Sequence, residues 1–316
     1  MAELAGHLLR RLLASAPSGW PSRLAGDLGG LFSYHFMVNA YEAGTIVAVL
    51  AALVGWFMVL RRQSFAGHTL SVVAFPGAAA ATLAGVSVGF GYYGFCLGAA
   101  LLIAFAPRGN TAVGGFSAES AVIGTVQAFA LASGFLFVAL YHGFLEGVNS
   151  LLFGTFLGIT DGQVVAMLLV ALGVLAVLAL VGRPLLFASI DPAIAAAHGV
   201  PVRLLGAAFL VLLGLTAAAT TQVTGALLVF ALLVMPPATA QRLTARPALS
   251  LALSVVIAVT VVWTALAIAY YSPYPLGFWV TTLAFGLYVA VGLGASLRRH
   301  SGRRRARHLG ALERGA

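Results

Sequence analysis

The chain contains no lysine, because all 17 of its basic residues are arginine. A P-loop needs a lysine that reaches the terminal phosphates, and Schiff-base catalysis needs an amine. The absence of lysine therefore excludes an ATPase site of the P-loop kind and a lysine Schiff base within this chain. Cys96 is the one cysteine and lies in an apolar run, which excludes an internal disulfide and a thiolate metal cluster.

Charge is scarce as well, with 8% charged against 61% hydrophobic residues and a mean hydropathy of +1.03. A soluble core of this length does not need so much apolar sequence, so the composition predicts a polytopic helical membrane protein. The basic balance, with a pI of about 10.4, would also suit nucleic acid. The arginines lie at span ends and in the tail, however, which is a membrane-topology pattern, and we expect no nucleic-acid partner.

The apolar runs predict nine candidate spans, since a transmembrane helix needs about 20 apolar residues. Leu83-Ala84-Gly85 joins the second and third runs, so one bent hairpin and two full crossings both stay open. The sequence thus predicts an all-α transmembrane bundle of eight to nine spans. The runs cover Phe36–Leu60, Gly67–Thr82, Val86–Ala106, Ala118–Tyr141, Gln163–Val181, Leu204–Gln222, Gly225–Leu243, Pro247–Tyr271 and Leu276–Leu297.

Arginine placement predicts the orientation, because cytoplasmic ends are enriched in Lys and Arg. With nine spans one side collects most of the arginines, which puts the C-terminus inside and the N-terminus outside. Residues 35–297 form the predicted transmembrane domain, and 298–316 a basic cytoplasmic tail that can touch anionic lipid. Residues 1–34 are expected to be an interfacial helix or a disordered segment, and not a signal peptide, since Arg10 and Arg11 interrupt its apolar part. The arginines assigned to the inner side are Arg61, Arg62, Arg108, Arg183, Arg203, Arg242, Arg246, Arg298 and Arg299.

His68 is a candidate functional residue, because ionisable side chains are costly inside a bilayer and usually face the interior of a bundle. Pro76 follows about two turns later, and its missing N–H leaves the Val72 carbonyl without a helical donor. His68 and Val72 lie one turn apart on one face, so the imidazole and the freed carbonyl border the same space. We predict a translocation path along His68, Val72 and Pro76. A histidine that serves packing stays open as the alternative.

The segment Asp191 to Pro201 carries the boundary signals of a short helix. Asp191 suits the N-cap, Pro192 the first helical position and Gly199 the left-handed position after the end. A helix of about two turns is marginal in water, so one that is retained packs against something. It is predicted either to lie on its own bundle or to couple the chain to a soluble partner through Asp191, Pro192, Ala195 and Gly199.

A second break is predicted at Met235-Pro236-Pro237, because adjacent prolines cannot occupy an undistorted helix. Small residues surround this break and the one at Pro76, and they permit close helix approach. Close packing and gating motion at Pro76, Pro236 and Pro237 are both compatible with the pattern.

Together these segments resemble the permease subunits of ABC importers for zinc, manganese and iron. The family pattern VLRRxSLxGDALSHAxLPG is similar to Val59–Gly77, and NxLLFGxxLG is similar to Asn149–Gly158. SxDPxxAxxxGxPV is similar to Ser189–Val202, and VGxLLVxALLxxPAATAxLL is similar to the segment from Val223 onward. The resemblance spans about Phe36 to Leu297.

The resemblance implies a multi-pass protein of a bacterial plasma membrane that dimerises with a second copy. It implies two ATP-binding subunits that hold ATP and Mg²⁺, an extracellular solute-binding protein, a transported divalent metal and no cofactor in this chain. The metal-handling Asp and His of the family pattern fall on His68 and Val72. An imidazole has replaced the acid and an aliphatic chain has replaced the imidazole, so a metal chelate or another small solute stays open as cargo.

A stand-alone secondary carrier or channel is the competing class. A proton-driven carrier would be expected to hold paired intramembrane acids, and none is evident within the predicted spans. A membrane scaffold or enzyme is a third class, and the sequence offers no combination of nucleophile and base for it.

Overall fold

The computed structural model describes residues 34–106, 115–141, 158–226 and 229–312, and its regular structure within these ranges is helical. Eight helices are long and apolar enough to cross a membrane, and α12 is shorter. The predicted all-α class and the count of eight to nine spans are confirmed. The helices are α4 (His35–Leu60), α5 (Ser64–Ala84), α6 (Val88–Phe105), α7 (Gly115–Leu140), α9 (Asp161–Ile190), α10 (Pro192–Ala197), α11 (Val202–Thr224), α12 (Val229–Leu243), α13 (Pro247–Tyr271) and α14 (Leu276–Leu312).

The structure settles one helix boundary that the sequence left open and moves another. Gly85 takes a left-handed φ of 70° after α5, so the second and third runs form two separate helices. Helix α9 continues to Ile190 through Pro184, whereas the sequence placed its end at Val181. A proline inside a bilayer helix is tolerated when neighbours satisfy the freed backbone groups. Residues 1–33 and 149–157, which carry the N-terminal prediction and most of one family pattern, lie outside the described residues.

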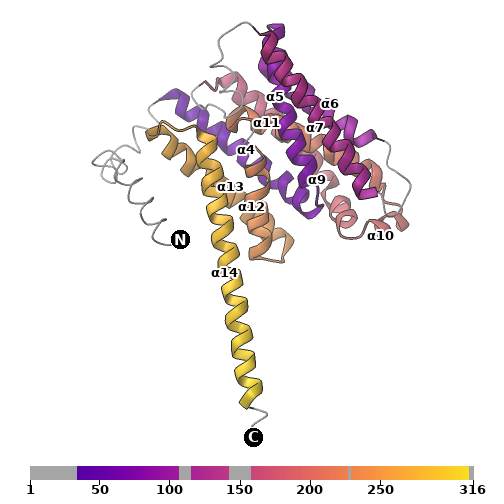
Figure 1. Ribbon diagram of the computed structural model, residues 1–316, viewed down its shortest axis with the longest axis vertical. Coiled ribbons are helices and arrows are strands. Elements are labelled where there is room, and N and C mark those ends of the chain that lie inside the picture. The colour runs from indigo at the N-terminus through magenta and orange to yellow at the C-terminus, as the bar shows by residue number, and fades with distance from the viewer. Residues whose placement is uncertain (1–33, 107–114, 142–157, 227–228, 313–316) are drawn as a thin grey trace.

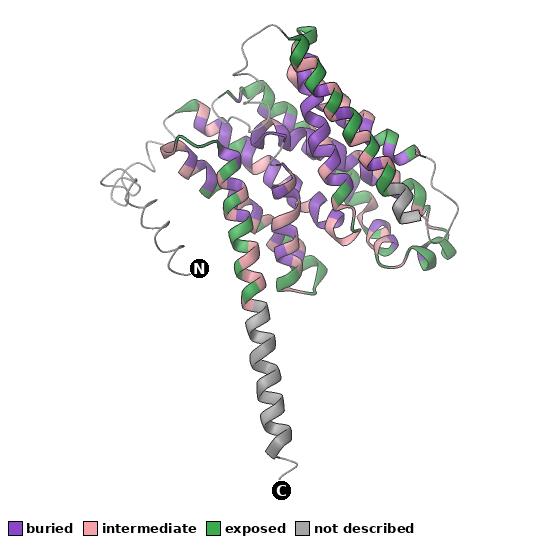
Figure 2. Cartoon of the chain, in the orientation of Figure 1, coloured by how far each residue is buried: buried purple, intermediate pink, exposed green. Residues whose placement is uncertain are grey.

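The helices form two groups with a central pair between them. Helices α5, α6 and α7 lie side by side at one edge, and α12, α13 and α14 pack together elsewhere in the bundle (Figure 1). Helix α4 contacts α9, α11, α12 and α13, whereas α11 contacts α4, α5, α6 and α9. Buried residues gather along α4, α5 and α11, and the outward faces of the peripheral helices are exposed (Figure 2). The exposed faces are apolar, as lipid contact requires.

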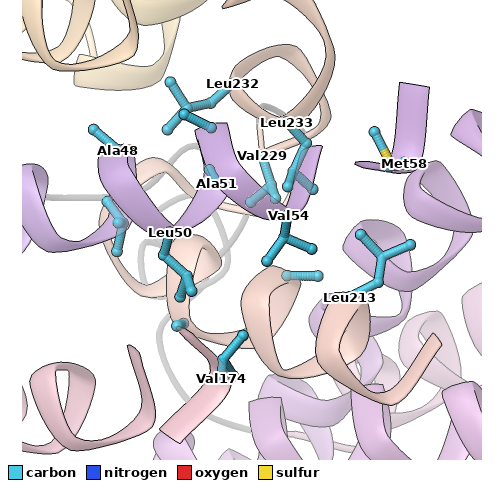
Figure 3. Packing of buried hydrophobic residues seen from close by; sticks show 14 of the residues in the cluster. Ala48, Leu50, Ala51, Val54, Met58, Val174, Leu213, Val229, Leu232 and Leu233 are labelled. Carbon is cyan, nitrogen blue, oxygen red and sulfur yellow. The ribbon is translucent and has the colours of Figure 1, made fainter. Parts of the chain in front are cut away.

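Helix α4 is the centre of the packing. Its residues Ala48, Leu50, Ala51 and Val54 are fully buried. Helix α12 covers one side of α4, while α9 and α11 cover the other (Figure 3). Small side chains let helices approach closely, which matters in lipid because burial from water does not drive association there.

Pro76 lies inside α5, between glycines of two neighbouring helices. Gly77 of α5 and Gly91 of α6 cross so closely that a Cβ on either would overlap with the other's carbonyl oxygen. Gly134 of α7 faces Pro76 from another direction, and a Cβ there would lie 3.0 Å from Pro76 Cβ and 2.9 Å from Phe75 Cε1. Helices α5, α6 and α7 are therefore closely packed around Pro76.

The proline pair inside α12 packs against α4 in a similar way. Pro237 removes the N–H that would bond to the Leu233 carbonyl. That carbonyl oxygen points at Gly55 of α4, where a Cβ would overlap with it. Gln241 Nε2 also donates to the Trp56 carbonyl of α4 at 3.0 Å. Helix α12 is therefore fixed to α4 at the point where its own hydrogen bonding is broken.

Candidate functional site

The His68 side chain lies in the second turn of α5 and faces α12. It is half-buried, and its ring meets Phe230 edge to face, with centroids 5.1 Å apart and planes at 70°. Val72 and Pro76 follow at helical spacing and are buried. The structure thus keeps the three predicted path residues on one helix and brings His68 to α12, which contains Pro236 and Pro237.

His68 Nδ1 is a buried ring nitrogen without a hydrogen-bond partner among the described residues. Buried polar atoms are nearly always paired in native structures, so an unpaired one indicates a ligand or a strained state. The neighbouring groups on α5 are satisfied: Thr69 Oγ1 donates to Gln127 Oε1 at 2.8 Å, and the Leu70 carbonyl accepts from Cys96 Sγ at 3.4 Å. His68 therefore carries the unpaired side-chain nitrogen in this stretch of α5, as far as the described residues show.

The chemistry of the site suits brief contact. A neutral imidazole nitrogen is a ligand for borderline divalent metals. No group of three or more His, Cys, Asp or Glu side chains that could hold a metal ion occurs in the described part of the chain. Val72 offers no ligand atom. One imidazole nitrogen beside an aromatic ring offers a single ligand to a metal and does not enclose one.

The predicted helix boundaries at α10 are confirmed. Asp191 Oδ1 accepts hydrogen bonds from the backbone N–H groups of Ala193 and Ile194, both at 3.0 Å. Pro192 opens the helix, and Gly199 takes a φ of 80° just beyond it. These are the N-cap, first-position and left-handed roles that the residue types favour.

The face that α10 exposes differs from the face that was expected. Ala195 is fully buried, so it packs α10 against the bundle and offers no contact surface itself. The His198 ring meets Phe187 of α9 edge to face at 5.9 Å and fixes the other end of the short helix. Ile194 and the preceding Ile190 remain 49% and 71% exposed. Ile190 at the end of α9 and Ile194 within α10 thus form an exposed apolar surface at this end of the bundle.

Arg61 is a residue whose contacts the sequence did not reveal. Its Nη1 donates to Ser189 Oγ at 3.3 Å and its Nε to Gln63 Oε1 at 3.1 Å. The guanidinium carbon lies 5.4 Å from the ring centroid of Phe209 on α11. From the sequence, Arg61 was an orientation signal and part of a family pattern, and nothing local links it to Ser189.

A second unforeseen cluster joins the first turns of α4 and α9. Asp161 Oδ1 accepts from Asn39 Nδ2 at 2.6 Å and lies 2.9 Å from His35 Nε2. Asn39 Nδ2 also donates to the Ile159 carbonyl at 3.1 Å. Thr160 is the N-cap of α9. The one sequence signal for this cluster was the spacing of His35 and Asn39, which places both side chains on one face of α4.

Comparison with known proteins gives consistent matches. Residues 33–294 match the model of the ABC 3 transport family. The chain is 31% identical over 213 residues to the manganese import system permease protein ScaB of Streptococcus parasanguinis, covering 67% of this chain and 74% of that protein. It is 32% identical over 217 residues to the chelated iron transport system membrane protein YfeC of Yersinia pestis, covering 68% and 71%. The solved structure of PsaBC from Streptococcus pneumoniae in complex with Fab superposes with a TM-score of 0.74 at 26% identity, covering 84% of this chain and 94% of that one.

Proposed function

The chain belongs to the ABC 3 transport family, and from this premise we propose that it carries divalent metal ions of the manganese and iron kind across a bacterial plasma membrane. It is the permease subunit of an ABC importer and not its ATPase. The observation that carries the proposal is the family match over nearly the whole helical bundle, together with relatives named for manganese and chelated iron.

The chain is part of an ABC transporter complex with ATPase subunits. In our proposal two copies of the chain pair with two ATP-binding subunits, which hold ATP and Mg²⁺, and an extracellular binding protein delivers the cargo. The α10 side of the bundle is then cytoplasmic, in agreement with the arginines assigned to that side. Ile190 and Ile194 insert into the ATPase, because an exposed apolar surface at a water-facing end favours a protein partner.

The translocation path in this proposal runs between α5 and α12. The unpaired nitrogen of His68 supplies one transient ligand while the metal passes, and Phe230 narrows the path beside it. Pro76 packs against Gly134 of α7 and Pro237 against Gly55 of α4, so in our proposal Pro76 moves with α6 and α7, and Pro237 moves with α4. The gate therefore opens by separation of two groups of helices, with contact between α5 and α12 as its closed state.

A metal chelate is the second candidate cargo. Val72 stands where the family pattern has a histidine, and one relative is named for chelated iron. A chelated ion brings most of its ligands with it, so it needs fewer from the path than a bare ion does.

Metal accumulation in cells tests the proposal. The chain would be expressed with its ATPase and binding protein in a host that lacks its own manganese and iron importers, and cell-associated metals would be measured by mass spectrometry. Accumulation of Mn²⁺ or Fe²⁺ supports the free ion, and accumulation of iron supplied solely as a chelate supports the second candidate. Accumulation of neither, with the complex present in the membrane, would overturn both.

A further inference from the structure

The turn between α4 and α5 fixes Arg61 at a junction of four helices. Arg62 N–H bonds to the Val59 carbonyl at 3.1 Å and Gln63 N–H to the Met58 carbonyl at 3.0 Å, while Arg62 takes a left-handed φ of 56°. These are the two hydrogen bonds of a Schellman motif. The motif ends α4 sharply and lets α5 start at Ser64, so Arg61 belongs to a rigid corner.

The Arg61 side chain leaves this corner and reaches two helices that are distant in sequence. It donates to Ser189 in the last turn of α9, and it stacks over the fully buried Phe209 of α11. A Cβ on Gly206 would lie 3.6 Å from Arg61 Nη2, an ordinary van der Waals distance, so the first turns of α11 pass beside the guanidinium. Ser189 stands just ahead of Asp191, the N-cap of α10. The guanidinium thus links the start of α10 to the start of α5.

We propose that Arg61 is a positioning residue that transmits displacement of α10 to α5. This inference rests on the proposed function, in which α10 receives the movement of the ATPase. A displacement of α10 shifts Ser189, Ser189 shifts the guanidinium, and the rigid corner shifts the first turns of α5, which carry His68. Arginine suits this role because its planar fork can donate and stack at once, whereas a lysine ammonium cannot.

The experiment uses the complete complex, reconstituted with its ATPase subunits and binding protein. ATP hydrolysis and metal uptake are measured together for Arg61→Gln, Arg61→Lys and the control Arg62→Gln, which removes the same charge from an exposed neighbour. We expect uptake per ATP to fall about fivefold for both Arg61 variants, at the low end of allosteric couplings, with ATP hydrolysis retained. The control keeps the wild-type ratio. An unchanged ratio in both Arg61 variants would overturn the inference.

Ser189→Ala provides a milder second variant, because it removes the acceptor hydroxyl and leaves the arginine. Arg61→Gln, Ser189→Ala and the double variant form a cycle in which contacting residues are non-additive. We expect the double variant to be no worse than Arg61→Gln alone, and additive losses contradict the link. If Arg61→Gln fails to assemble, Ser189→Ala decides: a wild-type ratio there rejects the link. If the wild-type complex itself shows no ATP-driven uptake, the proposed function fails instead.

Discussion

The family pattern has an aspartate at position 68 and a histidine at position 72, whereas this chain has His68 and Val72. One imidazole is therefore the available side-chain ligand of the two positions. The structure gives its Nδ1 nitrogen a buried position with no partner among the described residues, and the His68 ring has Phe230 of α12 as its aromatic neighbour. A single neutral ligand holds a metal weakly, which favours release. At the residue scale, the question is how far the rate of metal uptake depends on the His68 imidazole.

Replacing His68 with alanine should lower uptake by about tenfold, the equivalent of about 1.4 kcal/mol, because the passing ion loses its protein ligand. His68→Asp should restore part of the rate by supplying the acid of the family pattern. Uptake by the assembled complex is the measurement, with Thr260→Ala as control, since Thr260 is exposed on α13 and bonds to the Val256 carbonyl of its own helix. Unchanged rates for every metal tried in His68→Ala would leave His68 a packing residue.

At the scale of the helix, proline-containing helices and the short capped helix behave differently. Prolines lie inside α5 and α12, and glycines of neighbouring helices allow close approach beside these prolines. The short α10 is held by caps and by Ala195, so it is rigid although it is small. Each of these arrangements can be disturbed by one added methyl group or one charge.

Gly55→Ala should destabilise the protein by about 1–3 kcal/mol, because the new methyl overlaps with the Leu233 carbonyl and forces α4 and α12 apart. Gly173→Ala on α9 is the matched control, since its Cβ would meet open space. Alanine is the better helix former, so the control should be neutral or slightly stabilising. Thermal unfolding in detergent measures both, and equal melting temperatures for the two variants would refute the tight contact.

In α10, Ile194→Glu should affect binding of the ATPase, whereas Ala195→Leu should affect the stability of the permease itself. The glutamate lies on the exposed face and should prevent binding of the ATPase, while the isolated permease keeps its melting temperature. The leucine enters a filled space and should lower that melting temperature by an overpacking cost of about 1–3 kcal/mol. Co-purification and thermal unfolding measure the two effects. Full ATPase binding by Ile194→Glu would show that α10 docks through another face.

For the whole molecule, local signals in the sequence predicted the spans and the capped helix. Apolar runs and the types of residue at Asp191, Pro192 and Gly199 act within a few residues, so they can be recognised without the fold. The contacts of Arg61 with Ser189 and of Gly55 with Leu233 join distant segments, and no periodicity records them. Burial of Ala195 was missed for the same reason, since alanine is common on both faces of a helix.

The topology also belongs to this scale. Nine passes with the C-terminus inside predict that a reporter fused after Arg299 is cytoplasmic and that one placed within residues 272–275 is external. Enzyme reporters that are active on one side of the membrane distinguish the two positions. Signals from the same side would contradict the assignment of α14 as a crossing segment.

The most direct measurement is ATP-driven uptake of radioactive manganese into proteoliposomes that contain this chain, its ATPase subunits and its binding protein. The proposed function predicts accumulation that needs ATP and the binding protein, that iron supplied in excess reduces, and that His68→Ala lowers about tenfold. Accumulation without ATP would indicate a carrier or channel. No accumulation of manganese, and none of free or chelated iron in the same vesicles with active ATPase, would contradict the assignment of this chain as a metal permease.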